Sequence, residues 1–570
     1  MIRIAEDARS RRVRVVMSAA LAALLTAACA PEARASIYYV DYQAGSDAAD
    51  GVSPEGAWKH APGDPAATDR ASTIKLQPGD TVRFRGGVGY HGTIILPAGG
   101  TKSAPIVYAG DQWGSASAVI DGGDQVESVV PCPSAEACGG AANWNRLSLI
   151  SFDPPKTELI KFFDSTGNLF ESQYPSPKDQ FFSDDVSEYQ EVPLSEAEAV
   201  RNGALRSAPL ANAIASGPTK AQVSIWIQGN RVARKPIIGV AGDTIQFEPS
   251  GILPYTNRAG RAAVVNAVQQ VDRPGVYATI SAGKAVAWLR EGAAGSHLTI
   301  GNGRLGVDLN GRSNVVVRGF VFEHFVAGKY GEGTPLLNSA GLSTNPIVEA
   351  NIFRRSALYT GGGAVMIGNT DGAVIKGNTF ADLERGSGIR TARPVVSNLQ
   401  IVGNDFKRLG QTGILAMGVT NLTISKNTMS DLYGIHGNGI SLYMDNRGAL
   451  VSGNRIANST RPMTFHGEDP AKARNPGDHE IVIEHNFFAT PHKSAGAIIS
   501  FGNTRGVTIR DNVLVAPKVG LLLSATDTRL VVTGNHTTSI QTKGAQPPDW
   551  VVKDNSKPTA AQLKEAGLAH

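Results

Sequence analysis

Cysteine is scarce in this sequence, with 3 residues in 570, and aromatic residues make up only 6%. Charged residues are also few, at 18%, whereas hydrophobic residues reach 42%. These proportions exclude a generally disordered chain, which is rich in charge and poor in hydrophobic residues. Cys132 and Cys138 alone make a poor zinc site, and their close spacing indicates a small loop disulfide in an oxidising compartment.

Long hydrophobic runs are missing except near the start of the chain. A basic segment, residues 11–14, precedes an apolar run over residues 15–30, and Ala-Arg-Ala at residues 33–35 is typical of a signal-peptidase site. The run is too short for a membrane helix, which needs roughly 20 residues. We therefore expect a signal peptide over 1–35 and a secreted or periplasmic protein without a transmembrane span. Lipidation at Cys29, giving an outer-membrane lipoprotein, is the alternative.

A strong net charge is missing too. The formal charge is +4, and the expected signal carries six arginines and three acidic residues, so the mature chain has a charge of +1. A nearly neutral chain has no net attraction for polyanions, which argues against a nucleic-acid partner. The sequence does not indicate an oligomeric state.

The C-terminal half has neither helical periodicity nor the leucine frame of leucine-rich repeats, but it does repeat. Short β-branched runs alternate with turns and an asparagine every 23 to 32 residues, and this period predicts a solenoid of strands. We expect the asparagines to tolerate the left-handed turn conformation and to hydrogen-bond from coil to coil. They are Asn351, Asn378, Asn404, Asn427, Asn454, Asn486, Asn512 and Asn535.

The predicted fold is all-β: a right-handed parallel β-helix with a β-rich insertion and a short C-terminal helix. Thr559 and Gln562 have the spacing of a capping box at the start of that helix. The expected divisions are a signal peptide (1–35), N-terminal coils (36–120), the insertion (121–300), the main helix (301–545) and a tail (546–570).

Two stretches near the start carry a family resemblance. They are "SIYYVDYQAGSDAADGVSPEGAWK" (36–59) and "GDTVRFRGGVGYHGTI" (79–94). These stretches resemble the N-terminal segments of proteins in the pectin-lyase-like superfamily of secreted, polysaccharide-active β-helix proteins, and the repeats resemble the coils of those proteins. The resemblance implies the fold and a polysaccharide partner. It does not imply one activity, because this superfamily includes hydrolases, lyases, epimerases and adhesins.

Aligned strands of successive coils predict which side chains lie together. The aligned segments are 411–419, 438–445, 461–468 and 495–502. Ile414, Ile440, Met463 and Ala497 share one inward register in this alignment. Strand alternation then sends Ser441, Tyr443 and Asp445 outward, next to Thr464, His466 and Glu468 on the following coil. His466 therefore faces Tyr443, and Glu468 faces Asp445.

The predicted carboxylate pair suits glycoside hydrolysis. Neighbouring coils lie about 4.8 Å apart, near the separation of the two carboxylates of retaining glycosidases. Repulsion between them raises one pKa, which gives an acid beside a base or nucleophile. We therefore expect Asp445 and Glu468 to be catalytic with His466, and the substrate-binding residues to be His436, Tyr443, Arg390 and Arg461.

Each of these residues has a second interpretation. Asp445 precedes Asn446 at a strand end, where such residues satisfy turn amides, and Glu468 begins a long polar segment that suits a solvated loop. Two acidic residues together also suit Ca²⁺, although few further oxygen ligands are evident; no other cofactor or metal is expected. His436 lies in a glycine-rich turn that it could simply cap. Arg390 either binds a substrate carboxylate or pairs with Glu384.

Two other function classes remain open. A lyase or epimerase acting on a uronate polymer needs a cation such as Arg390 or Arg461 and a base, for which Tyr443, His466 and Lys493 are candidates. No lysine occupies an aligned outward position, which weakens this alternative. A glycan-binding surface protein without catalysis is the third class. The sequence favours the hydrolase, and does not indicate the sugar, the linkage or endo against exo action.

Overall fold

The structure is a computed structural model of the chain. It describes residues 35–183, 185–214, 220–228, 231–249, 260–292, 298–391, 395–434, 436–467, 479–493 and 496–568. The predicted signal peptide, with Cys29, lies outside these residues except for Ala35. Export and lipidation therefore stay predictions.

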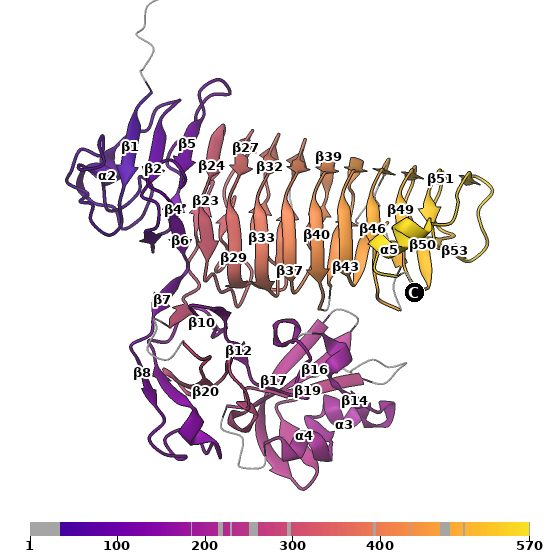
Figure 1. Ribbon diagram of the computed structural model, residues 1–570, viewed down its shortest axis with the longest axis horizontal. Helices are drawn as coiled ribbons and strands as arrows, with labels where there is room; N and C mark the ends of the chain where they lie inside the picture. Colours follow the sequence, from indigo (N-terminus) through magenta and orange to yellow (C-terminus); the bar gives the residue numbers. More distant parts are fainter. Residues whose placement is uncertain are drawn as a thin grey trace, which may run out of the picture.

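Three long parallel sheets, here called A, B and C, form a β-helix whose coils each pass through A, then B, then C (Figure 1). Sheet A contains β1 (Ile37–Val40), β2 (Thr81–Phe84), β5 (Ile106–Ala109), β24 (Val315–Arg318), β28 (Ile347–Glu349), β32 (Val374–Lys376), β36 (Gln400–Val402), β39 (Val419–Ser425), β42 (Arg447–Ser452), β45 (Val482–Glu484), β48 (Thr508–Arg510), β51 (Val531–Thr533) and β54 (Val551–Lys553), with β27 (Ser343–Thr344), β31 (Thr370–Asp371) and β35 (Val396–Ser397) beside them.

Sheet B contains β3 (Gly89–Tyr90), β6 (Val119–Asp121), β25 (Val321–Glu323), β29 (Ile352–Ala357), β33 (Thr379–Glu384), β37 (Asp405–Leu409), β40 (Thr428–Leu432), β43 (Arg455–Ser459), β46 (Phe487–Ala489), β49 (Val513–Val515) and β52 (His536–Thr537). Sheet C contains β4 (Ile94–Ile95), β23 (Val307–Asp308), β26 (Leu336–Leu337), β30 (Gly363–Ile367), β34 (Ser387–Thr391), β38 (Ile414–Met417), β41 (Asn438–Tyr443), β44 (Arg461–Phe465), β47 (Gly496–Ser500), β50 (Val519–Ser524) and β53 (Ile540–Lys543). The predicted parallel β-helix is confirmed.

The core of the solenoid is built from the inward side chains of all three sheets. Because strand residues alternate between faces, every second residue enters this core. Phe322, Phe353, Phe380 and Phe406 occupy one inward position on successive coils, and their rings stack with centroids 4.6 to 5.0 Å apart. Such a stack fixes the coil-to-coil register as well as excluding water.

The predicted asparagine ladder runs between sheets A and B. The Asn427 carboxamide donates to Asn454 Oδ1 at 2.9 Å, and its own oxygen accepts from the backbone and side-chain amides of Asn404. The ladder continues beyond the predicted set to Asn555. The expectation of left-handed asparagines is wrong here, because the positive φ falls on the preceding residue, as at Lys426 and Gly453.

Sheet B carries a second column of left-handed residues, which the sequence does not reveal. Arg355, Asp382, Arg408, Asp431 and Asn458 lie opposite one another on successive coils, with φ between 46° and 60°. The strand register continues unchanged on both sides of each residue. Asn and Asp tolerate this conformation, but for arginine it is strained, so surrounding contacts must hold it.

The chain leaves the solenoid after β6 and returns before β23, and the segment between forms the insertion (Figure 1). Its sheets are β11–β10–β22–β7, β12–β20–β21–β9–β8 and β13–β19–β16–β17–β18–β15 with β14 beside β19. The strands are β7 (Gly123–Gln125), β8 (Ser128–Pro131), β9 (Ser148–Ser151), β10 (Phe162–Asp164), β11 (Gly167–Asn168), β12 (Phe170–Glu171), β13 (Gln173–Tyr174), β14 (Gln190–Val192), β15 (Ala204–Arg206), β16 (Gln222–Gln228), β17 (Arg231–Ala241), β18 (Thr244–Phe247), β19 (Gly260–Val265), β20 (Val276–Ser281), β21 (Lys284–Trp288) and β22 (Thr299–Gly301). The predicted disulfide joins Cys132 and Cys138 within it.

The insertion packs against sheet B, beneath the solenoid in Figure 1. Lys161 is buried and pairs with Glu384 on β33. Arg408 donates to Asp179 at 3.1 Å, and the rings of Phe182 and Tyr433 meet edge to face at 5.2 Å. A buried charge without its partner is strongly unfavourable. The Lys161–Glu384 pair therefore holds the insertion in one position on the solenoid.

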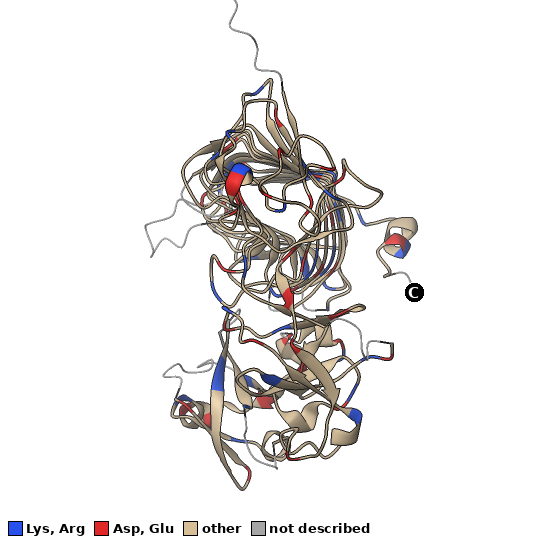
Figure 2. Ribbon diagram, turned by 90° about the vertical axis from the view of Figure 1, so that its left-hand side faces the viewer, with Lys and Arg blue, Asp and Glu red and all other residues tan. Residues whose placement is uncertain are grey.

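The C-terminal helix α5 (Ala560–Glu565) starts with the predicted capping box, in which Thr559 and Gln562 bond each other's backbone amides. Figure 2 shows charged residues of both signs scattered over the solenoid and the insertion. Along the described part of the chain, no helix combines the length and apolar composition that crossing a bilayer requires.

Candidate functional site on the outer face of sheet C

The outer face of sheet C carries a row of rings on three successive coils. Leu442 lies opposite Phe465 and Phe465 opposite Ser500, so the next residues, Tyr443, His466 and Phe501, follow in line. The Tyr443 and His466 rings meet edge to face with centroids 4.9 Å apart, as the sequence alignment predicts. The His466 and Phe501 rings stack at 4.3 Å. We call Tyr443, His466 and Phe501 the ring row.

Phe501 is the member of the ring row that the sequence alignment missed. The expected register, with Ala497 opposite Met463, is wrong by one residue, because Met463 pairs with Ile498. Both residues are buried and apolar, so composition could not distinguish the two registers. Shifting the alignment by one residue brings Phe501 opposite His466. Its side chain is 47% exposed, and that of Tyr443 is 36% exposed, so the ring row presents open aromatic surface.

Ser441 and Thr464 have the predicted outward direction but do not reach solvent. They are 5% and 1% exposed, and their hydroxyl oxygens lie 2.9 Å apart. The Asn438 carboxamide donates to Ser441 at 3.0 Å. The two hydroxyls therefore bond each other beside the ring row, whereas Asn438 Oδ1 has no partner among the described residues. We assign Asn438, Ser441 and Thr464 a positioning role for β41 and β44.

Asp445 lies beyond the strand on which it was expected. Strand β41 ends at Tyr443, and Met444 and Asp445 both adopt left-handed conformations, with φ of 59° and 61°. The Asp445 carboxylate accepts a hydrogen bond from Arg447 Nε at 2.8 Å. The prediction that the strand continues to Asp445 is therefore wrong. Glu468, its predicted partner, lies outside the described residues, so their predicted pairing stays a prediction.

Two histidines and an arginine surround the ring row. Burial lowers the pKa of His466 to about 4, with His436 and Arg461 nearby as further causes. The pKa of His436 is lowered by burial and then by Arg461. The His436 carbonyl accepts from Thr412 Oγ1 and from the backbone amide of Asn438, which holds the turn before β41. At neutral pH His466 is therefore an uncharged imidazole with an acceptor nitrogen.

Arg390 and Arg461 are half-buried cations on the same side of the solenoid. Burial lowers the pKa of both, and the neighbouring tyrosines Tyr330 and Tyr359 partly offset this at Arg390. The alternative in which Arg390 pairs with Glu384 is wrong, because Glu384 pairs with Lys161. Arg390 Nη2 instead approaches Met417 Sδ at 3.8 Å. Among the described residues, neither arginine has a carboxylate partner.

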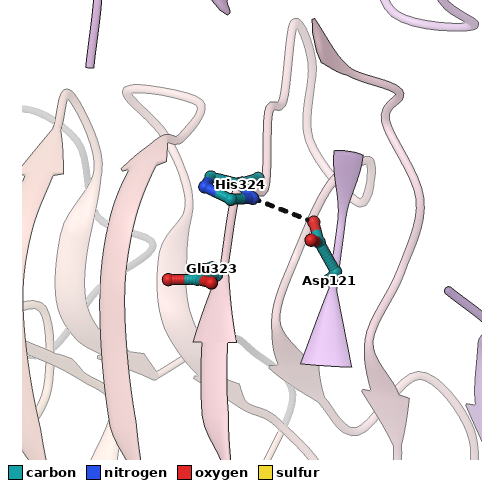
Figure 3. Close-up of side chains that lie close together, drawn as sticks. All are labelled: Asp121, Glu323 and His324. Carbon is teal, nitrogen blue, oxygen red and sulfur yellow. Dashed lines mark hydrogen bonds and ion pairs between the residues drawn. The ribbon is translucent and has the colours of Figure 1, made fainter. Parts of the chain in front are cut away.

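A second cluster of polar side chains lies where the chain enters and leaves the insertion (Figure 3). Asp121, Glu323 and His324 are of metal-ligating types, and one potential ligand atom from each lies within 4.8 Å of the others. Each already has a protein partner: His324 Nδ1 bonds Asp121 at 3.1 Å, and Arg354 donates to Glu323 at 2.8 Å. The neighbouring arginine and these satisfied bonds fit a structural junction better than a cation site.

The family model for the right-handed β-helix region matches residues 290–456 and 340–544. A solved structure described as a glycoside hydrolase superposes with a TM-score of 0.55 at 16% identity, over 94% of this chain and 99% of that one. The shared fold thus includes the insertion as well as the solenoid. No curated protein matches the sequence.

Two further solved structures are more distant. XylC in complex with xylose has a TM-score of 0.48 at 14% identity, over 88% of this chain and 72% of that one. The lacto-N-biosidase of family GH136 from Eubacterium ramulus has a TM-score of 0.39 at 11% identity, over 91% and 67%. Below a TM-score of 0.5, these two similarities carry no argument about the chain.

Proposed function

We propose that this chain, which has a right-handed parallel β-helix and shares its fold with a solved glycoside hydrolase structure, is a polysaccharide-cleaving enzyme whose substrate lies along sheet C. The ring row is the observation that carries this proposal. Sugars present flat apolar C–H faces to aromatic rings and hydroxyls to polar groups beside them. Tyr443 and Phe501 offer aromatic rings to the C–H faces of a sugar. His436, His466 and Arg461 offer polar groups to its hydroxyls.

The proposed reaction is glycoside hydrolysis. Asp445 and Glu468 act as the acid/base and nucleophile pair, in an order that is left open, with the scissile bond beside the ring row. Arg447 orients the Asp445 carboxylate through its 2.8 Å hydrogen bond. The uncharged His466 accepts a hydrogen bond from a sugar hydroxyl, and Arg461 donates to one.

A uronate lyase is the second candidate, and Arg390 and Arg461 are the observation that favours it. Both are cations without a carboxylate partner among the described residues. A lyase needs such an unpaired cation to neutralise the carboxylate of its substrate. The base is the weak point of this candidate. His466 has a pKa of about 4, and a base is most effective when its pKa lies near the working pH.

Product analysis distinguishes the candidates. The protein is incubated with neutral and uronic-acid polysaccharides, and both reducing ends and the ultraviolet absorbance of unsaturated products are followed. Hydrolysis gives reducing ends alone, and elimination gives both signals. Polysaccharide binding without either signal supports the third class, a glycan-binding surface protein.

A further inference from the structure

A cavity of about 290 Å³ lies at the junction of the insertion and sheet B, away from the ring row on sheet C. The solenoid contributes Arg355, Asp382 and Arg408 to its lining, and the insertion contributes Asn168, Phe181 and Arg290 among others. The volume is at the small end for ligand sites and suits a single sugar ring.

The left-handed column of sheet B forms the solenoid wall of the cavity. Arg355, Asp382 and Arg408 lie opposite one another on β29, β33 and β37. Arg408 is held by Asp179 at 3.1 Å and by Asp382 at 3.6 Å. Arg355 is half-buried, and no described carboxylate lies within ion-pair distance of it. Its guanidinium therefore keeps hydrogen-bond donors that a ligand in the cavity can use.

Asn168 on β11 gives the insertion wall a buried polar group without a partner. The residue is 5% exposed, and neither the nitrogen nor the oxygen of its carboxamide has a hydrogen-bond partner among the described residues. Arg290 donates to the Asn168 carbonyl at 2.7 Å and to Asp164 at 2.9 Å, which fixes both residues. Buried polar groups are nearly always hydrogen-bonded, so an unpaired carboxamide that lines a cavity indicates a missing partner.

We propose that this cavity binds the carboxylate-bearing unit of an acidic sugar. Asp164 pairs with Arg290, and Asp179 and Asp382 both pair with Arg408. None of these carboxylates pairs with Arg355, so its guanidinium is available to the ligand carboxylate. The Asn168 carboxamide matches a sugar hydroxyl. Phe170 and Phe181 line the cavity beside these groups and give it an apolar wall. The proposal is separate from the reaction on sheet C and does not depend on it.

Isothermal titration calorimetry of the full chain tests the proposal, with D-glucuronate, D-glucose and inorganic sulfate as probes. The test variant is Arg355→Asn, because the same column already holds asparagine at position 458 in the left-handed conformation. Lys407→Asn is the matched control: Lys407 is exposed on β37 and does not line the cavity. We expect glucuronate to bind more tightly than glucose and sulfate. Arg355→Asn should weaken it roughly tenfold or more, as loss of a charge-assisted bond does, and Lys407→Asn should not change it.

A second variant tests the site independently in case Arg355→Asn does not fold. Asn168→Asp keeps the shape of the side chain and adds a negative charge, so it should also weaken glucuronate binding. The proposal is wrong if glucuronate does not bind, or if Arg355→Asn binds it as the parent does. Sulfate binding as tight as glucuronate binding would also overturn it, in favour of an inorganic anion site. Loss of glucuronate binding in Tyr443→Ala, with binding intact in Arg355→Asn, would place the ligand on sheet C and overturn it too.

Discussion

The imidazole of His466 lies almost parallel to the ring of Phe501, at an interplanar angle of 13° and a centroid distance of 4.3 Å. The two residues are 35 positions apart in the sequence and come together because they occupy the same outward position on adjacent coils. Tyr443 then meets the other side of His466 edge to face. The three rings are held in place by each other and by the sheet. Substrate binding therefore does not have to include the entropy loss of ordering them.

Phe501 should therefore matter for substrate binding more than for the chemical step. Replacing it with alanine removes one stacking face, which is worth about 0.5–1.5 kcal/mol. We expect Phe501→Ala to raise KM about two- to tenfold with kcat nearly unchanged. Val551→Ala is the control, since Val551 is an exposed apolar residue on sheet A. An unchanged KM in Phe501→Ala would show that substrate does not contact the ring row.

The half-buried His466 should make the free energy of unfolding depend on pH. Its folded pKa of about 4 lies below the unfolded value of about 6.5, so only the unfolded chain takes up this proton between those values. The free energy of unfolding should therefore have its full value above pH 6.5 and fall by about 1–3 kcal/mol as the pH drops to 4. Denaturant unfolding at several pH values measures this slope.

His466→Gln removes the titrating group and should flatten the slope. His492→Gln is its control, because His492 is exposed beyond the end of β46. An equal slope in the parent and in His466→Gln would assign the pH dependence to other groups.

The asparagine ladder should dominate the stability of the solenoid. Asn427→Ala removes the acceptor of the Asn404 backbone amide and the side-chain donor to the Ile401 carbonyl. The Asn404 carboxamide loses one hydrogen bond but keeps its bond to the Ile375 carbonyl. Each unsatisfied buried group is unfavourable by about 1–3 kcal/mol, so we expect a total loss of at least about 2 kcal/mol. Thr428→Ala provides the comparison, since Thr428 is exposed on β40 and does not have a positive φ. Urea unfolding should separate the two variants, and equal midpoints would contradict this role for the ladder.

The solenoid was predictable because repetition makes its signal strong. Each coil repeats the β-branched run and the asparagine, and this was enough to place Tyr443 opposite His466. The next register was missed because Ala497 and Ile498 are both apolar and buried.

Other features depend on backbone conformation or on distant parts of the chain. Positive φ at Arg355 and Arg408 cannot be inferred from residue type, since arginine rarely adopts it. The same holds for Asp445, whose left-handed turn takes it off the strand. The Lys161–Glu384 pair joins residues more than 200 positions apart, and only the packing of the insertion brings them together.

We propose that Asp445 and Glu468 hydrolyse a polysaccharide that binds at the ring row. The variants Asp445→Asn and Glu468→Gln should each lower the rate about 10²- to 10⁴-fold, the usual contribution of an acid/base group, without changing the unfolding midpoint. Asp405→Asn, an exposed carboxylate on sheet B, should retain full activity.

The most direct measurement is product formation by the parent protein and Glu468→Gln on the polysaccharide that the parent degrades. We expect reducing ends without ultraviolet absorbance for the parent, and neither signal for Glu468→Gln. Full activity in a folded Glu468→Gln protein, or unsaturated products from the parent, would contradict this expectation.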